Sequence, residues 1–348
     1  MGRRYRLPKF KVGPQVYMYN QVKDKKPWSL VERSVPEHWA KTQGEGVRVA
    51  VLDTGLWKHR DLPEPAFAKN FTDSPDVYDV QGHGSHVAGT VGARQDGAGV
   101  VGWAPKCEIG CCKVLDDEGT GDSDWIADGI RYAVDQGAHI INMSLGGGPD
   151  DIIADACRDA IQEGVFVICA AGNEGDMGGI NTIGWPARLR ETIAVASYRR
   201  DGKISDYSSR GPEVDVAFPG EDILSTWLDN QFRKISGTSM ATPACSGLTA
   251  LMLARHWEVE KKGELKTPIR NNTQLREHFK RFALDRGEEG HDRDFGWGIP
   301  DVGGLITDEN GVKAAASVLP AIAAGRFGVK PLHHDGRDGL FVWNLMEE

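Results

Sequence analysis

Three side chains of the kinds used in acyl transfer stand far apart in the sequence. Asp53 ends the apolar run VRVAVL, His83 opens the stretch HGSHVAGTVGA, and Ser239 stands in SGTSMATPACSGLTALML. A serine hydroxyl attacks a carbonyl only when a base takes its proton. An imidazole serves as that base near neutral pH, and a carboxylate fixes the tautomer of the imidazole. An isolated aspartate or histidine is usually a strand cap or a satisfied ring, but the three together indicate a hydrolase with a nucleophilic serine.

The glycines around His83 predict a tightly packed helix start. Gly82 and Gly84 let the backbone approach strand ends and a bound peptide, because no Cβ stands in the way. The small residues in 88–92 let the following helix pack closely inside the protein. We expect His86 to support that helix by hydrogen bonding and to take no part in the chemistry.

A repeating order of strand and helix is expected to position these residues. Apolar runs that end in Gly, Asp or Asn alternate with a helical pattern; the runs are 47–52, 139–145, 165–171 and 191–197, and the helical pattern is clearest at 151–163. Such alternation predicts an α/β fold with a mostly parallel central sheet and helices on both faces. Functional residues of these sheets gather beyond the carboxyl ends of the strands, where Asp53 and Asn173 fall.

Composition and motifs argue against several other classes of protein. The net charge of −9 and the lack of a long basic run in the body of the chain make nucleic acid an unexpected partner. No GxGxxG follows the strand at 47–52, which argues against dinucleotide binding. No apolar segment is long enough for a secretory signal or a membrane span, so we expect a cytoplasmic protein. The six cysteines lack metal-ligand spacing and are predicted to be buried thiols.

Four sequence blocks together carry a family resemblance. AVLDTG, GHGSHVAGTV, AAGNEG and GTSMATP resemble the signature blocks of the subtilisin-like serine proteases, and the chain order Asp, His, Ser is the order known for subtilisin. The resemblance extends over about residues 30–306 and is nearest to the intracellular subtilisins. It implies that the α/β fold is of the subtilisin-like type. It implies that Ser239 attacks the peptide carbonyl, that His83 is the general base and then acid, and that Asp53 orients the imidazole. Asn173 and the Ser239 N–H would form the oxyanion hole.

The same resemblance implies a substrate cleft with a peptide bound between two backbone segments. The implied substrate-binding residues are Gly119, Thr120, Gly121, Ile126, Ser144, Leu145, Gly146, Gly172 and Gly184. Gly172 and Gly184, being small, are expected to leave a deep pocket for a large apolar side chain. Acidic residues lie around these segments: Asp116, Asp117, Glu118, Asp122, Asp124 and Asp128. They are either a solvated face or a source of preference for basic substrate residues.

Resemblance also implies a calcium ion (Ca2+). The loop RQDGAGVVG matches the calcium loop of the family in length, and the implied ligands are Asp24, Asp61 and Asp96 with the carbonyls of Arg94, Ala98 and Val100. Calcium prefers several oxygen ligands, including backbone carbonyls. A polar surface loop without metal is the alternative.

The N-terminal segment has a charge opposite to that of the rest. Residues 1–28 hold eight cations and one anion, a net of +7, which leaves −16 for the remainder. We expect residues 1–27 to be a short propeptide that lies across the cleft, because Arg6-Leu7-Pro8 is similar to the blocking part of intracellular subtilisins. The alternative is a disordered arm for anionic partners. The expected catalytic domain is 28–306.

Residues 307–348 form a C-terminal extension that packs on the domain, mediates a homodimer or is removed, so a monomer and a homodimer both remain open. His333 and His334 in this extension either bind metal or belong to a solvated tail. The expected substrates are polypeptides. Two rival functions use the same scaffold: a catalytically silent peptide-binding protein, and a hydrolase of small amides or esters.

Overall fold

The structure, a computed structural model, describes residues 4–16, 23–264 and 268–307. Its centre is a seven-stranded sheet in the order β10-β9-β8-β7-β3-β5-β4, in which every neighbouring pair is parallel. The strands are β3 (Arg48–Asp53), β4 (Phe67–Asn70), β5 (Glu108–Lys113), β7 (Ile140–Met143), β8 (Phe166–Ala170), β9 (Ile193–Tyr198) and β10 (Val214–Pro219). The predicted parallel α/β sheet is confirmed.

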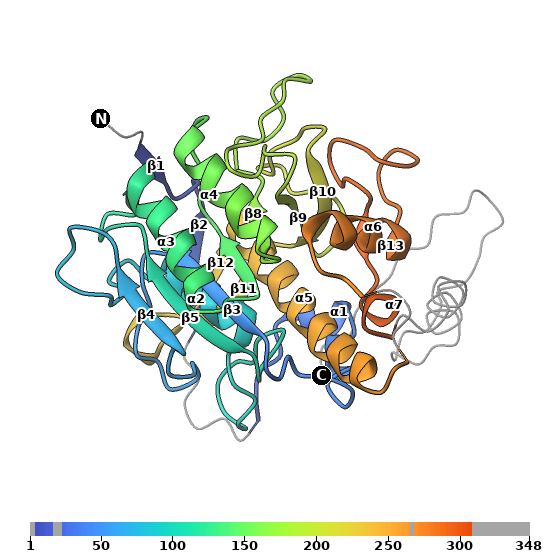
Figure 1. The fold of residues 1–348 in the computed structure, drawn as a ribbon, viewed down its shortest axis with the longest axis horizontal. Helices are drawn as coiled ribbons and strands as arrows, with labels where there is room; N and C mark the ends of the chain where they lie inside the picture. Colours follow the sequence, from blue (N-terminus) through green and yellow to red (C-terminus); the bar gives the residue numbers. More distant parts are fainter. Residues whose placement is uncertain (1–3, 17–22, 265–267, 308–348) are drawn as a thin grey trace.

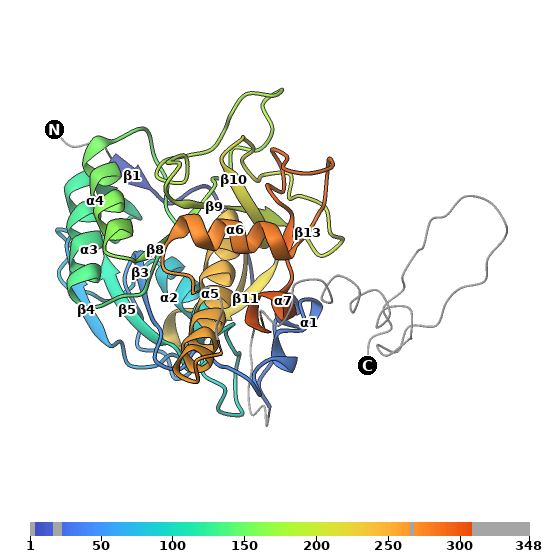
Figure 2. The same cartoon turned by 45° about the vertical axis from the view of Figure 1, so that its right-hand side comes forward.

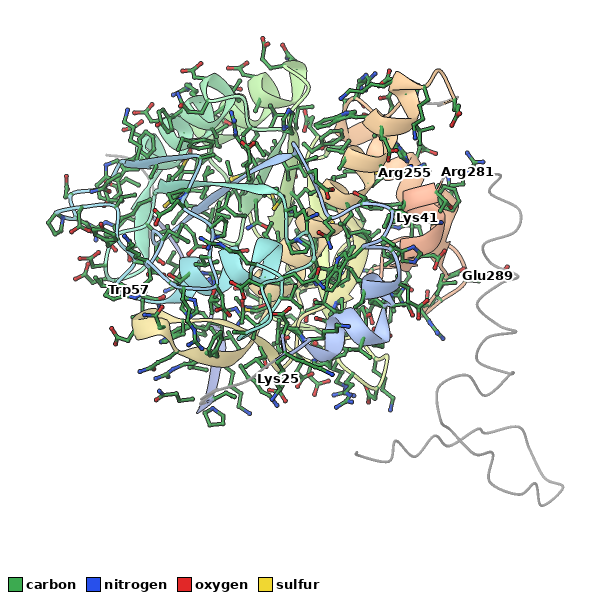
Figure 3. The ribbon with its side chains drawn as sticks, turned by 90° about the horizontal axis from the view of Figure 1, so that it is seen from below. Lys25, Lys41, Trp57, Arg255, Arg281 and Glu289 are labelled. Carbon is green, nitrogen blue, oxygen red and sulfur yellow. The ribbon has the colours of Figure 1, made fainter. Side chains whose placement is uncertain are left out.

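Helices cover both faces of this sheet (Figures 1 and 2). One face packs against α2 (His83–Gly92) and the long helix α5 (Thr238–Lys261), and the other against α3 (Ser123–Asp135) and α4 (Asp151–Gln162). The expected helix at 151–163 is α4, and its start is capped by the Asp150 carboxylate, which accepts hydrogen bonds from the N–H groups of Ile152 and Ile153. Charged side chains such as Lys41, Arg255 and Glu289 stand at the periphery (Figure 3).

Shorter elements complete the domain. They are α1 (Trp28–Glu32), η1 (Val35–Glu37), η2 (Leu228–Asn230), α6 (Asn272–Phe282), α7 (Val302–Thr307) and the hairpin-like pair β13 (Ala283–Leu284) with β14 (Ile299–Pro300). No helix among the described residues has the length and apolar character needed to cross a membrane. All six cysteines are buried and unbridged, as the sequence predicts. Residues 308–348, including His333 and His334, lie outside the described residues.

Two N-terminal strands pair with separate parts of the domain. β1 (Arg4–Arg6) is antiparallel to β6 (Thr120–Asp122), and β2 (Lys11–Val16) is antiparallel to β12 (Phe232–Ser236), which also pairs with β11 (Ile223–Thr226). We call residues 4–16 the arm. The segment between its two strands passes the carboxyl end of β3 and the start of α5.

Glycine allows the close packing at α2 that the sequence predicts. All ten residues of this helix are buried. A Cβ added at Gly89 would collide with Thr226 Oγ1, and one at Gly84 would collide with the Gly55 carbonyl oxygen. Gly82, which precedes the helix, has a φ of +96°, and an added Cβ there would run into the Trp227 ring. The helix that begins with His83 is therefore held tightly against its neighbours.

Candidate active site

A buried carboxylate and a buried imidazole meet at the end of β3. His83 Nδ1 lies 2.8 Å from Asp53 Oδ1, and both side chains are fully buried. Asp53 Oδ1 also accepts a hydrogen bond of 2.8 Å from the Thr54 N–H. The contact fixes the imidazole so that Nδ1 carries the proton and Nε2 is the free acceptor. Asp53 and His83, 30 residues apart in the sequence, form the predicted carboxylate and base pair.

Ser239 lies in the first turn of α5, directly after Thr238. Its Oγ donates a hydrogen bond of 3.2 Å to the carbonyl oxygen of Ser144. His83 Nε2 has no hydrogen-bond partner among the described residues. The serine hydroxyl is thus turned towards Ser144, and no described hydrogen bond joins it to the imidazole. Because one torsion angle sets the position of a serine Oγ, a change of rotamer alone moves it.

Asn173 is held in the domain by its oxygen, and its nitrogen faces the arm. Asn173 Oδ1 accepts hydrogen bonds of 2.9 Å from both the N–H and the hydroxyl of Thr238. Its Nδ2 donates to the Lys9 carbonyl oxygen at 2.7 Å. A Cβ added at Gly237 would lie 3.2 Å from Asn173 Nδ2 and 3.7 Å from Ser239 N, so these two donors flank the same small space.

The arm lies in the predicted cleft as an additional strand. β1 pairs Arg4 with Asp122, Tyr5 with Gly121 and Arg6 with Thr120. On its other side, Arg6 exchanges two backbone hydrogen bonds of 3.3 Å with Gly146. The Leu7 N–H continues the pattern with a bond of 3.0 Å to the Gly119 carbonyl. A peptide is therefore bound between the two backbone segments that the sequence pointed to.

Side chains of the arm fill the space around these segments. Tyr5 is fully buried in the hydrophobic cluster that contains Ile126 and Leu145, and its hydroxyl donates to Gly148 O at 2.6 Å. Pro8 is buried as well. The Phe10 ring lies with its centroid 4.9 Å from that of His83. The arm thus covers the imidazole.

The deep pocket expected at Gly172 and Gly184 stays a prediction, but the room for an added Cβ differs between the two glycines. A Cβ added at Gly172 would lie 2.5 Å from Glu174 Oε2 and 2.8 Å from Ser209 Oγ, so its own side is filled. Glycine is needed there because φ is +114°. At Gly184 an added Cβ would meet only ordinary contacts, at 3.8 Å and beyond. Of the two glycines, Gly184 is the one that leaves space.

Comparison with known proteins agrees with this geometry. Residues 44–298 match the subtilase family. The chain belongs to the subtilase family of serine endopeptidases. It is similar to the intracellular serine protease of Paenibacillus polymyxa, with 41% identity over 262 residues that cover 72% of this chain and 79% of that protein.

Two relatives from Bacillus subtilis (strain 168) match a similar stretch. The major intracellular serine protease is 41% identical over 272 residues, which cover 75% of this subtilase and 83% of the relative. Subtilisin E is 35% identical over 265 residues, which cover 75% of this chain and 67% of the relative.

The sequence did not point to a buried acid, Asp79. In this subtilase it joins the segment after β3 to the start of α2. Asp79 accepts hydrogen bonds from the Thr54 hydroxyl at 2.9 Å, from the Gly82 N–H at 2.7 Å and from both the N–H and the hydroxyl of Ser85. Burial raises the pKa of this carboxyl. The only sequence signal is an acid four residues before His83.

Lys113, also missed, is a fully buried lysine at the end of β5. Its Nζ donates to the carbonyl oxygens of Thr54 at 2.8 Å and Tyr78 at 3.0 Å, and to Asp117 Oδ1 at 2.7 Å. The hydrogen bond from Lys113 lowers the pKa of Asp117. The signal available in the sequence was a charged residue, Lys113, at the end of the mostly apolar run EIGCCK.

The acidic residues near the cleft differ in their tasks. Asp117 holds Lys113, and an Asp116 oxygen accepts hydrogen bonds from the N–H groups of Glu118 and Thr120, which closes a turn. Asp122 lies 3.9 Å from the Arg4 guanidinium across the β1–β6 pair. Part of this face is therefore structural, and Asp122 is placed beside a basic residue of a bound strand.

Hydrogen bonds tie Asp24 and Asp61 to the loop 94–100, so the six residues of the expected calcium site lie together. Asp61 Oδ2 accepts a hydrogen bond of 2.8 Å from the Val100 N–H, Asp24 Oδ1 accepts one of 3.0 Å from Gly97, and Asp96 Oδ1 accepts one of 3.3 Å from Ala98. The Arg94 N–H donates to the Asp61 carbonyl at 2.7 Å.

The chemistry of this loop suits a hard cation. Burial raises the pKa of Asp61 to about 6, and the charges of Asp96 and Asp24 add to that rise. Within the described part of the chain, no three His, Cys, Asp or Glu side chains cluster closely enough to hold a metal by themselves. A cation would therefore need backbone carbonyls as well, which calcium accepts.

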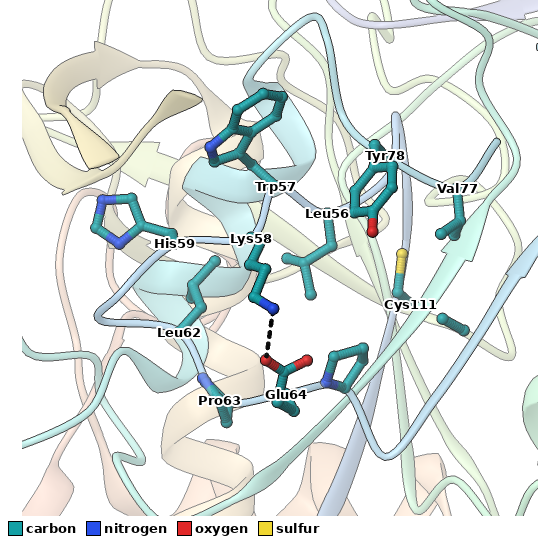
Figure 4. Close-up of a pocket in the computed structure, with 12 residues that line it drawn as sticks. Leu56, Trp57, Lys58, His59, Leu62, Pro63, Glu64, Val77, Tyr78 and Cys111 are labelled. Carbon is teal, nitrogen blue, oxygen red and sulfur yellow. Dashed lines mark ion pairs between the residues drawn. The ribbon is translucent and has the colours of Figure 1, made fainter. Parts of the chain in front are cut away.

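A cavity of about 170 Å³ lies beside the site, between the segment 56–65 and Tyr78 (Figure 4). The Lys58 ammonium and the Glu64 carboxylate, 3.8 Å apart, lie at this cavity. Neither Asp53 nor His83 lines it. The arm occupies the cleft next to Asp53 and His83.

His86 has the supporting role that the sequence predicts. Its Nε2 lies 2.9 Å from Ile223 O and 3.0 Å from Arg233 O, so the neutral ring joins α2 to β11 and β12. Burial, with a smaller effect from His83, lowers the pKa of His86 to about 3. The ring is uncharged at neutral pH.

This low pKa predicts how acid acts on stability. Between pH 6.5 and pH 3 the unfolded chain binds a proton at this residue and the folded chain does not, so the free energy of unfolding falls with falling pH, by at most about 1.4 kcal/mol per pH unit. We expect the His86→Gln variant to have a shallower slope between pH 6.5 and 4.5 in urea unfolding, with Ser239→Ala in both proteins to prevent self-digestion. The slope of the variant stays above zero, because His59, whose pKa is lowered to about 4, still contributes to it. An unchanged slope would contradict the assignment.

Proposed function

We propose that this subtilase cuts polypeptides with Ser239 as nucleophile, His83 as base and Asp53 as the carboxylate that orients the base. The observation that carries the proposal is the buried contact of 2.8 Å between His83 and Asp53, with His83 Nε2 left without a hydrogen-bond partner among the described residues. In a substrate complex the Ser239 hydroxyl rotates from Ser144 O to His83 Nε2 and gives up its proton there as Oγ attacks the carbonyl carbon.

Asn173 and the Ser239 N–H then stabilise the negative charge that develops on the carbonyl oxygen. Two contacts from Thr238 fix the Asn173 amide before substrate arrives, so little reorganisation is needed during the reaction. His83 next gives its proton to the leaving amine and afterwards activates a water that releases the acyl group. The substrate is held as a strand between residues 119–121 and 144–146, as the arm is.

The arm keeps the intact chain inactive. The N–H of Leu7, the residue before Pro8, donates to Gly119 O. The pairing of Arg6 with Gly146 puts Pro8 opposite Ser144, but Pro8 has no N–H to donate to the Ser144 carbonyl. The Ser239 hydroxyl takes that carbonyl, and the Asn173 amide holds the Lys9 carbonyl. Ser239 is thereby turned away from its base while the oxyanion donor is occupied. The docked strands β1 and β2 support this reading over an arm that seeks anionic partners.

Further proposals concern the surroundings of the enzyme. Calcium bound by Asp24, Asp61 and Asp96 with the carbonyls of 94, 98 and 100 would offset two of the three negative charges of these carboxylates and stiffen the loop. The names of the two intracellular relatives support a cytoplasmic location. The Arg4–Asp122 contact supports a preference for basic residues four to five positions before the scissile bond. Monomer and homodimer both remain compatible with the described residues.

Loss of the nucleophile and of the oxyanion donor should have separable effects. We expect Ser239→Ala to abolish labelling by a fluorophosphonate and cleavage of casein. Asn173→Ala should keep the labelling site but lower kcat by about 100- to 1000-fold with little change in KM, the range measured for such a donor in subtilisin. Labelling without casein cleavage would point to a hydrolase of small molecules, and absence of labelling in the processed protein would point to a silent peptide binder.

Removal of the arm should activate the enzyme at once. A chain that begins at Lys23 retains Asp24 and is expected to hydrolyse a peptide substrate without a lag, at an initial rate about tenfold or more above that of the intact chain, which corresponds to about 1.4 kcal/mol of arm docking. In the full chain, Pro8→Ala should shorten the lag, because alanine has the backbone N–H that proline lacks and can donate it to Ser144 O. Equal initial rates for the intact and shortened chains would show that the arm is no inhibitor.

Chelation should lower thermal stability if calcium binds the loop. We expect the melting temperature of the Ser239→Ala protein to fall by about 3 °C or more in a chelator, since a ligand that binds only the folded state stabilises it. Calcium should restore the loss and magnesium should not, because the loop offers many oxygens at flexible spacing. Asp61→Asn should make the melting temperature insensitive to chelator. A parent protein that ignores the chelator would rule out the site.

A further inference from the structure

The second strand of the arm lies on a sheet edge that leads directly to the nucleophile. β2 pairs with β12 through Lys11–Ser236, Val12–Ile235, Gln15–Arg233 and Val16–Phe232. Ser236 is three residues before Ser239. The other edge of β12 is taken by β11, so β2 occupies its only remaining edge. When the arm leaves, the backbone N–H and C=O groups of this edge lose their partners.

Two positions on β2 show that the edge selects what it binds. Val16 packs on a small hydrophobic cluster whose members are each at most 3% exposed: Ala93, Val100, Leu224 and Phe232. At Gly13 an added Cβ would lie 3.0 Å from Lys234 O and 3.4 Å from Lys234 Cβ, which disfavours a larger residue. Val12, by contrast, is 42% exposed and contributes little.

Charge does not hold β2 in place. β12 carries Arg233 and Lys234, while β2 carries Lys11 and no acid. No ion pair joins the two strands within the described residues. Backbone pairing and the burial of Val16 are the remaining sources of binding.

We propose that the free edge of β12 is a docking site for the substrate segment that follows the scissile bond, out to its eighth residue. This inference rests on the proposed function. The pairing of Arg6 with Gly146 and of Leu7 with Gly119 places Pro8 directly before the scissile position, although Asn173 holds the Lys9 carbonyl. In this register Lys9 is the first residue after that position, Gly13 the fifth and Val16 the eighth. The processed enzyme therefore prefers extended stretches of unfolded protein with a small residue at the fifth position and an apolar residue at the eighth. Short peptides that end before the eighth residue lack the contact that Val16 makes.

The catalytic domain has its core without the arm, so a shortened chain suits the test. Tyr5 and Pro8 are the buried residues of the arm, and both lie in the cleft. The two large hydrophobic clusters take all their other buried members from Leu30 onward. A chain of residues 23–348 with Ser239→Ala binds peptides without cutting them, and cooperative thermal unfolding checks its folding.

Fluorescence anisotropy then measures the Kd of labelled peptides that share YRLP and carry two, four or eight following residues of the arm. We expect the eight-residue form to bind at least about tenfold more tightly than the four-residue form, a difference of about 1.4 kcal/mol. Val16→Asp in the peptide should remove this gain, whereas the matched change Val12→Asp should keep it and Gly13→Val should reduce it. Equal Kd values for four and eight residues, or equal losses from both aspartates, would overturn the proposal.

The same measurements separate this inference from the proposed function. Binding of the eight-residue peptide needs no nucleophile. The peptide can therefore bind even if the protein that retains Ser239 does not cleave casein, and casein can be cleaved even if the eight-residue peptide gains no affinity. If the edge pairs with a second copy of the chain instead, the shortened protein would sediment as a dimer and the four- and eight-residue peptides would bind it with equal Kd, which would overturn the proposal.

A second measurement uses the full chain and does not depend on the shortened one. In the Ser239→Ala protein, hydrogen exchange at the amides of 232–236 reports the docking of β2. We expect Val16→Asp to speed this exchange at least several-fold and Val12→Asp to leave it unchanged. Equal protection in both variants would refute a selective site for the eighth residue.

Discussion

The contact between Asp53 and His83 is the constraint on which the rest of the site depends. A carboxylate in full burial is unfavourable unless hydrogen bonds compensate for the lost water. Here His83 and the Thr54 N–H supply them, while Asp79 and Lys113 hold the Thr54 hydroxyl and carbonyl. The glycines at the start of α2 follow from the same need, because the helix must come close to β3 for the ring to reach the carboxylate.

The arm shows how the cleft binds an extended polypeptide segment. It adds a strand to β6 on one side of the nucleophile and to β12 on the other, so both flanks recognise backbone before they recognise side chains. Backbone recognition accepts many sequences, and discrimination falls to a few enclosed places, such as the one that holds Tyr5. Under the proposed function, a substrate makes the same backbone contacts as the arm. What differs is Pro8, which cannot donate to Ser144 O and leaves that carbonyl to the Ser239 hydroxyl.

Much of the fold was predictable because its signals are local. Apolar runs that end in Gly, Asp or Asn mark buried parallel strands, and the expected runs appear as β3, β7, β8 and β9. The helix expected at 151–163 is α4. Asp79 and Lys113 escaped prediction for a physical reason. An acid in a loop and a lysine at a strand end are ordinary in sequence, and only the packing of β5 against β3 and of the 79–85 turn against Thr54 buries them. Likewise, only folding brings Ser209 beside Gly172, where its Oγ would lie 2.8 Å from an added Cβ.

The sequence by itself determined which residues could do chemistry, their order along the chain, and the alternation of strands and helices that brings Asp53 and Asn173 to one edge of a sheet. These properties depend on residue type and on periodicity over a few residues. Only the tertiary structure decided the rotamer of Ser239, the register of the arm and the identity of the carbonyl held by Asn173. Each of these is set by contacts between segments 95 or more residues apart, such as Ser144 with Ser239 and Lys9 with Asn173, whose energies depend on positions in space that no local pattern encodes.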